Sequence, residues 1–193
     1  GVYYLMKHRT STILSIFFFC VFLSFSAPSI LAIECGLTPT DHCTISENTI
    51  FLPLSFTLHN ITFVRDNVIL DCNSATLIGK SVNPLPLVYV GGRSGIVIQN
   101  CNFQKYYSDA ISNEGKRGPG ESTLPIGYFT ITNNTFASNN RAFALRLTDQ
   151  LPPDRTRSAL TNHIITANTI VGDHKMGILI ENASGSYIAN NNI

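Results

Sequence analysis

The sequence has 193 residues, of which 44% are hydrophobic and 13% are charged, and its formal net charge is +1. This balance argues against nucleic acid as a partner, because phosphate binding needs a cluster of uncompensated Lys and Arg residues. The low charge also argues against a disordered chain, and the length suits one domain with a sizeable core.

The N-terminal segment resembles an export signal. A basic stretch at residues 7–9 precedes the apolar run Ile13–Phe25, and small residues follow up to Ala32, where cleavage is expected. The alternative is an uncleaved membrane anchor, because residues 13–31 nearly reach spanning length. We assign residues 1–32 to a signal peptide. We expect a secreted, periplasmic or cell-surface protein that has no membrane contact after cleavage.

Four cysteines remain after this signal, and export makes disulfides reasonable. A bridge between Cys35 and Cys43 would staple a short N-terminal cap. For Cys72 and Cys101 two alternatives stay open, a second disulfide or two small buried residues in neighbouring layers. No metal site is expected, since His42 beside Cys43 is too little for zinc.

A repeat of about 23 residues carries the fold prediction. Three columns recur in four segments of the chain: Ile98, Ile131, Ile165 and Ile188; then Cys101, Asn134, Asn168 and Asn191; then Phe103, Phe136, Ile170 and Ile193. The interval from Ile165 to Ile188 is one repeat without insertions. The two earlier intervals, from Ile98 to Ile131 and from Ile131 to Ile165, are longer because they contain the loops 113–127 and 148–161. Residues 61–77 form an earlier, less regular unit.

Short β-branched and aromatic runs, with no 3.6-residue apolar period, favour strands. Such short strands cannot bury one face alone, so equivalent strands of successive units stack in parallel at about 4.8 Å. Asn suits the sharp corners and can form a ladder of stacked amides. We predict an all-β, single-stranded parallel solenoid of about five coils over 61–193, after a cap segment and first strands at 33–60.

These repeats resemble right-handed parallel β-helix proteins of the pectate-lyase-like superfamily. The segments 96–103, 129–136 and 177–193 carry the resemblance, and 64–79 is similar to the strand pair that often opens such domains. The resemblance covers most of residues 45–193. The repeat breaks off at Ile193 in mid-unit without a cap, so we expect a chain truncated at its C-terminus.

The resemblance implies activity on acidic polysaccharides, although this scaffold serves many functions. Members of the superfamily include lyases, uronate epimerases and hydrolases, and others are surface or assembly proteins. Proton abstraction beside a carboxylate needs a base and a neutralising cation, so Ca²⁺ is a candidate cofactor. We expect a monomer that binds, and as a candidate activity modifies, an acidic polysaccharide or cell-surface glycan. The alternative is a non-catalytic surface or envelope scaffold.

Polar residues between the first and second strand of each unit form the candidate catalytic site. In register, Lys105, Asn140 and Asp173 would stack, as would Tyr106, Arg141 and His174. A base, a carboxylate and a cation would then lie within a few layers; the candidates are Asp109, Arg141, Asp173, His174 and Lys175. The alternative is a set of ordinary solvated turn residues.

The two long loops leave equivalent corners of successive units, so we expect them to lie side by side. Their cations are candidate substrate-binding residues: Lys116, Arg117, Arg155 and Arg157. The loops could equally be hydrophilic insertions.

Two further features are left open by the sequence. His163 stands in a column with Ile96, Phe129 and Ser186, so we expect a core or groove residue. Three triplets match N-glycosylation acceptors, at Asn60, Asn133 and Asn182, although such triplets arise by chance in an Asn- and Thr-rich ladder and matter only in a eukaryotic secretory pathway.

Overall fold

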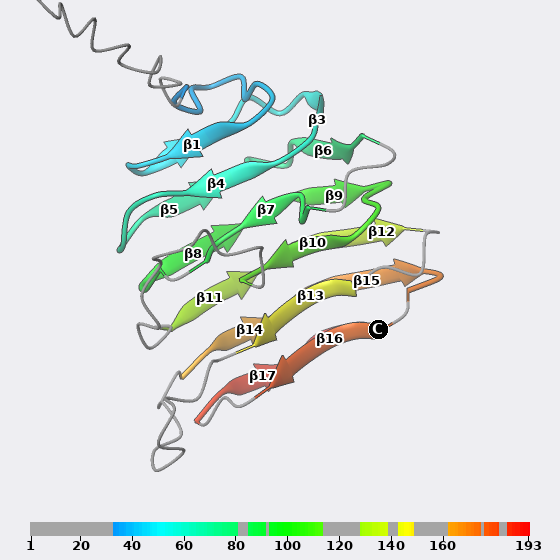
Figure 1. Ribbon diagram of the computed structural model, residues 1–193. Helices are drawn as coiled ribbons and strands as arrows, with labels where there is room; N and C mark the ends of the chain where they lie inside the picture. The colour runs from blue at the N-terminus through cyan, green and yellow to red at the C-terminus, as the bar shows by residue number, and fades with distance from the viewer. Residues whose placement is uncertain are drawn as a thin grey trace, which may run out of the picture. The chain divides into compact units, whose positions relative to one another are not determined.

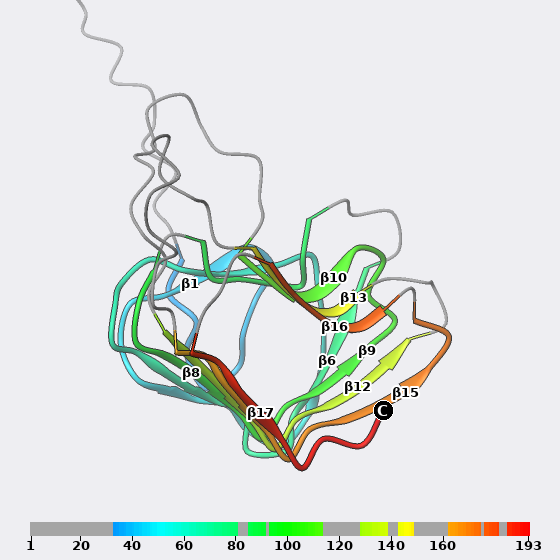
Figure 2. The ribbon, with the colours of Figure 1, turned by 90° about the horizontal axis from the view of Figure 1, so that it is seen from below.

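Three parallel sheets form the sides of a β-helix in the computed structural model (Figures 1 and 2). The structure describes residues 33–80, 85–91, 93–113, 128–138, 143–148, 162–174, 176–181 and 185–193. None of these residues lies in a helix, so none forms a helix that could cross a membrane. The all-β prediction is therefore confirmed.

In the described residues, each of the first five coils contributes one strand to each sheet, and the last coil contributes one strand each to sheets A and B. Sheet A contains β1 (Cys43–Ile45), β4 (Ile61–Phe63), β7 (Val88–Tyr89), β10 (Asp109–Ser112), β13 (Phe143–Thr148) and β16 (Met176–Glu181). Sheet B contains β2 (Thr49–Ile50), β5 (Ile69–Asp71), β8 (Ile96–Gln99), β11 (Phe129–Thr132), β14 (Ile164–Thr166) and β17 (Tyr187–Ala189). Sheet C contains β3 (Ser55–Leu58), β6 (Thr76–Gly79), β9 (Asn102–Gln104), β12 (Thr135–Ser138) and β15 (Thr169–Gly172).

The apolar columns of the repeat lie in register, and Ile98, Ile131 and Ile165 are buried, whereas Ile188 in the last coil is exposed. Ile98 pairs with Ile131, Ile131 with Ile165, and Ile165 with Ile188. In sheet C, Phe103 pairs with Phe136, and their rings stack with centroids 5.0 Å apart. Because equivalent side chains face inward in each coil, the stack buries a continuous core.

Asparagines form the corner between sheets B and C. Asn134 and Asn168 are buried, and the backbone N–H of Asn134 donates to Oδ1 of Asn168 over 3.0 Å. The Nδ2 of Asn134 donates to the carbonyl oxygen of Ile98 at 3.0 Å. The residue before each ladder position, such as Asn133, has a positive φ, which Asn tolerates better than most residues. The predicted amide ladder is confirmed.

Two disulfides tie the first coils together. Cys35 bonds to Cys43, as predicted, and Cys72 bonds to Cys101, which resolves the alternatives that the sequence left open. Cys101 occupies the ladder column, and its N–H donates to Oδ1 of Asn134 over 3.0 Å. Two disulfides are typical of proteins that fold in an oxidising, extracytoplasmic environment.

His163 is a core residue. Its side chain is fully buried and stacks on Phe129 with ring centroids 5.1 Å apart. The backbone N–H of Phe129 donates to its Nδ1 at 3.2 Å. Of the two alternatives for this histidine, the structure therefore shows the core position.

Candidate functional site

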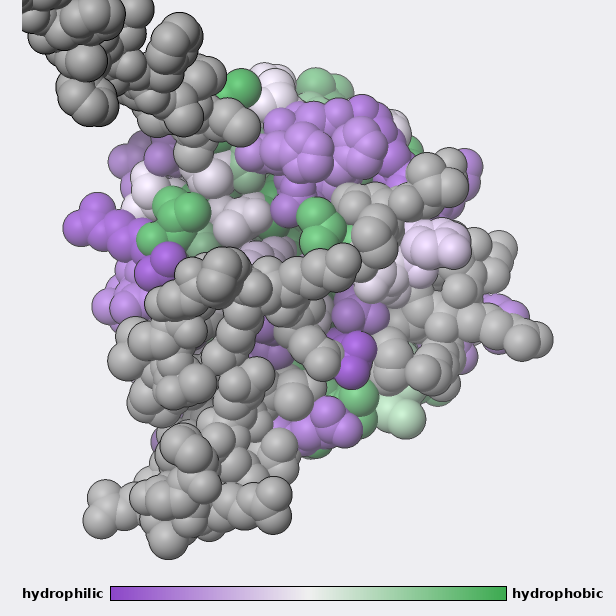
Figure 3. Space-filling model, in the orientation of Figure 1, coloured by the Kyte–Doolittle hydropathy of each residue, from purple (hydrophilic) through white to green (hydrophobic). Residues whose placement is uncertain are grey.

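A polar network lies where the first two coils enter sheet A. The pairing of Cys43 with Ile61 places Asp41 and His42, which precede β1, beside His59 and Asn60, which precede β4. Lys80, directly after β6, reaches the same place from sheet C. Figure 3 shows hydrophilic side chains gathered over the first coils near the top of the view.

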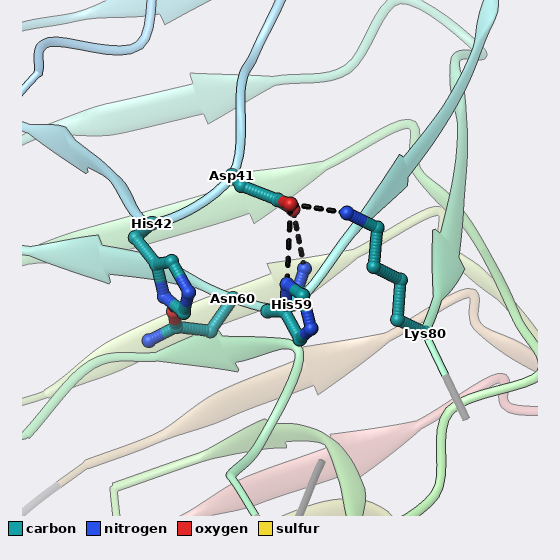
Figure 4. A network of polar contacts seen from close by, with 5 residues as sticks. All are labelled: Asp41, His42, His59, Asn60 and Lys80. Carbon is teal, nitrogen blue, oxygen red and sulfur yellow. Dashed lines mark hydrogen bonds and ion pairs between the residues drawn. The ribbon is translucent and has the colours of Figure 1, made fainter. Parts of the chain in front are cut away.

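Asp41 is the centre of this network (Figure 4). Its Oδ1 accepts a hydrogen bond from the backbone N–H of His59 at 2.8 Å, and its Oδ2 lies 3.1 Å from the His59 Nδ1. The same Oδ2 forms an ion pair with the Lys80 ammonium. Burial raises the pKa of Asp41, but the hydrogen bonds from Lys80 and His59 outweigh it and lower this pKa to about 2. The carboxylate is therefore ionised at any physiological pH.

The second imidazole, His42, is held in one tautomer. Asn60 Nδ2 donates to Thr62 Oγ1 at 3.2 Å, so the Asn60 Oδ1 faces the Nδ1 of His42, 2.6 Å away. A carbonyl oxygen only accepts, so the His42 Nδ1 carries the proton and, in the neutral ring, its Nε2 is a proton acceptor. The His42 and His59 rings are stacked, with centroids 5.1 Å apart.

No pattern in the sequence predicted this network. Its members lie in the first coils, where the repeat is least regular, and the ion pair joins residues 39 positions apart. The sequence offered one signal. A pair of polar residues stands directly before each strand: Asp41 and His42 before Cys43, and His59 and Asn60 before Ile61. Only the register of β1 on β4 turns that recurrence into contact.

A second feature is a cavity of about 570 Å³ at the corner between sheets A and B. It is lined by the turns that follow β1 and β4 and by Arg93, which follows β7. The Nε of Arg93 is buried and has no hydrogen-bond partner among the described residues. Arg65, Asp66 and Glu47 are exposed at the same cavity. A cavity of this size lies within the range of ligand sites, roughly 300–1,000 Å³.

The candidate catalytic residues that the structure describes lie between sheets C and A. Tyr106 and His174, which the repeat alignment places in one column, do stack, with ring centroids 5.9 Å apart. The His174 Nε2 donates to the carbonyl oxygen of Val171 at 2.9 Å, so in the neutral ring its Nδ1 accepts from the Tyr106 hydroxyl at 3.3 Å. Burial and the negative charge of Asp109 raise the pKa of Tyr106, which keeps this hydroxyl protonated.

The two candidate carboxylates differ in accessibility. Asp109 opens β10 and is buried, with 5% of its surface exposed, whereas Asp173 is exposed in the turn before β16. The other candidates lie outside the described residues: Arg141, Lys175, Lys116, Arg117, Arg155 and Arg157. The catalytic and substrate-binding roles of all these residues stay predictions. Within the described part of the chain, no three His, Cys, Asp or Glu side chains are grouped to hold a metal ion.

Comparison with known proteins identifies the fold family. A family model described as a right-handed β-helix region matches residues 86–193, more than half of the chain. No curated protein and no solved structure showed significant similarity to the sequence. The matched residues contain strands β7 to β17, which continue the three sheets begun by the first coils. The chain therefore belongs to the right-handed β-helix family.

Proposed function

We propose that this protein is exported and binds an acidic polysaccharide on the outer face of its first three coils. The observation that carries the proposal is Arg93, which lines the corner cavity and whose Nε is buried without a hydrogen-bond partner among the described residues. A buried donor without a partner is costly, and a carboxylate is the group that a guanidinium binds best.

The rest of the cavity suits the hydroxyl groups of a sugar. Asp66 uses Oδ1 to accept the backbone N–H of Ser94 at 3.0 Å, and Asn48 uses Oδ1 to accept that of Ile69 at 2.9 Å. These bonds fix both side chains and leave the Asp66 Oδ2 as an acceptor and the Asn48 Nδ2 as a donor. Arg65 adds a second positive charge to the lining, which also carries the carboxylates of Glu47 and Asp66. An acidic sugar supplies the matching carboxylate and hydroxyls.

The network around Asp41 extends the same face. It lies at the N-terminal end of β1 and β4, and the cavity lies at their C-terminal ends. The four residue-to-residue steps from His42 to Ser46 span roughly 13 Å in an extended strand. A chain of a few sugar residues bound in the cavity would therefore reach His42 and Lys80.

Export rests on two observations. The two disulfides favour an oxidising compartment, and residues 1–32 carry the signal-like sequence. A secreted, periplasmic or surface-exposed protein meets polysaccharides in each of these locations.

The test is binding of uronate polymers to the full-length protein. We expect calorimetry at low salt to show binding of polygalacturonate or alginate and none of neutral dextran. Arg93→Ala should weaken this binding by about tenfold or more, because a charged hydrogen bond is lost. Lys105→Asn is the matched control: it removes one charge from the corner between sheets C and A, and Asn tolerates the positive φ of Lys105.

Equal affinity of wild type and Arg93→Ala, or equal binding of dextran, would contradict the proposal. The same mixtures also test for a lyase, because β-elimination leaves an unsaturated sugar that absorbs in the ultraviolet. Adding and withholding Ca²⁺ tests the candidate cofactor. Binding without any change in the polymer would favour the non-catalytic scaffold among the two functions that the sequence allows.

A further inference from the structure

Asn133 and Asn60 each begin an N-glycosylation triplet, and their side chains differ in exposure and in hydrogen bonding. Asn133 is exposed at the corner between β11 and β12, and its Nδ2 donates to the Asn100 Oδ1 at 2.6 Å. Thr135, which completes the triplet, is the first residue of β12. Asn182 lies outside the described residues.

Asn60 stands in the opposite environment. Only 9% of its surface is exposed, and both polar atoms of its side chain are used. The Oδ1 binds the His42 Nδ1 at 2.6 Å, and the Nδ2 donates to Thr62 Oγ1 at 3.2 Å. A glycan on this nitrogen would have no room beside these partners and would break the network that joins the first two coils.

We propose that Asn133 is a site of N-glycosylation and that Asn60 is excluded from it in the folded protein. The acceptor nitrogen attacks the anomeric carbon of a lipid-linked oligosaccharide diphosphate. A bond forms between Nδ2 and that carbon, the bond from the carbon to the diphosphate oxygen breaks, and the lipid diphosphate leaves with the electron pair. The nitrogen loses one of its two protons.

The folded structure tolerates the product at Asn133. The substituted amide keeps one N–H, which can still donate to Asn100 Oδ1, because this pair is exposed to solvent. The corner between sheets B and C is also a different corner from that of the Arg93 cavity, so a glycan on Asn133 leaves the proposed polysaccharide site open (Figure 2). The inference is thus independent of the proposed function.

The experiment is secretion of the full chain from a eukaryotic cell line, followed by peptide N-glycosidase F digestion in heavy-oxygen water. Mass spectrometry then identifies each asparagine converted to labelled aspartate. We expect the label on Asn133 and none on Asn60. Thr135→Ala should abolish the label on Asn133 although Asn133 itself is retained, and Thr135→Ser should restore it because a serine also completes the triplet.

Asn182→Gln serves as a background in which any remaining mobility shift comes from the other two triplets. An unlabelled Asn133 in secreted protein, or a label that persists in Thr135→Ala, would overturn the proposal. A glycan on Asn60 in protein that has formed both disulfides would also overturn the proposal. If Thr135→Ala is not secreted, Asn133→Gln tests the same site by removing the acceptor asparagine itself.

Discussion

At the residue scale, the corner between sheets B and C depends on single backbone conformations. Asn100, Asn133 and Asn190 occupy the left-handed region with φ between 54° and 58°. In the coil between the last two, the equivalent residue is Ala167, with φ 55°. Alanine has no side-chain polar group to compensate for this conformation, so Ala167 carries backbone strain that its neighbours in the column avoid.

The substitution Ala167→Asn should therefore stabilise the protein. Relief of the left-handed strain predicts a gain of about 1 kcal/mol in the free energy of unfolding. Urea denaturation followed by circular dichroism measures it. Ala137→Asn is the control, because Ala137 lies within β12 and has no positive φ. No gain in Ala167→Asn, or an equal gain in the control, would contradict the explanation.

At the scale of the element, the amide ladder joins neighbouring coils through their backbones. The side chain of Asn134 takes the N–H of Cys101 at 3.0 Å, and its own Nδ2 goes to the Ile98 carbonyl. Both backbone groups belong to the preceding coil. They are enclosed by the core and cannot reach water, so a partner for each of them is a condition for stacking.

Asn134→Ala should consequently destabilise the protein by about 3 kcal/mol, because two buried backbone groups lose their partner at once. The midpoint of urea unfolding should fall accordingly. Asn133→Gly changes the preceding residue but keeps the ladder, and glycine suits the φ of 54° there, so its midpoint should move little. If the two variants lose the same stability, the ladder has no special role.

At the scale of the whole molecule, the Asp41 network and the two disulfides hold the first coils together. Asp41 precedes β1, His59 precedes β4 and Lys80 follows β6, so one carboxylate joins successive turns of the β-helix. Each coil contacts only its neighbours, so a link between coils contributes to the cooperativity of the stack.

This link makes stability depend on pH. The pKa of Asp41 falls from its ordinary 3.8 to about 2 in the folded protein, through its hydrogen bonds to Lys80 and His59 and despite burial. Its contribution is complete above 3.8 and is lost as the pH falls towards 2. Because a third of this side chain is exposed, we expect about 1 kcal/mol after solvent screening.

Urea unfolding of wild type and Asp41→Asn over that pH range is the measurement. Wild type should be more stable at neutral pH, and the difference should vanish at the acidic end. In Lys80→Gln, the decline should be smaller and should end at a higher pH, because the folded-state pKa of Asp41 then lies closer to 3.8. Parallel curves for wild type and Asp41→Asn would show that this carboxylate does not link folding to protons.

The sequence by itself determined the fold of the repeats. Ile98, Ile131 and Ile165 recur with Asn134 and Asn168 because every coil packs equivalent side chains into the same core. Each coil therefore needs the same residue types at the same positions, and the sequence repeats. It also determined that Cys35 and Cys43 could pair, because they are close in the chain.

Only the tertiary structure decided the Cys72–Cys101 bond, the Asp41 network and the Arg93 cavity. These features join residues of different coils, and those residues do not recur in the other coils. The periodicity of the sequence therefore does not predict them. Their meeting depends on the register of one coil on the next, which is fixed by the core and not by the residues that meet. The sequence could therefore predict the scaffold, while the contacts on its outer face required the coils to be stacked.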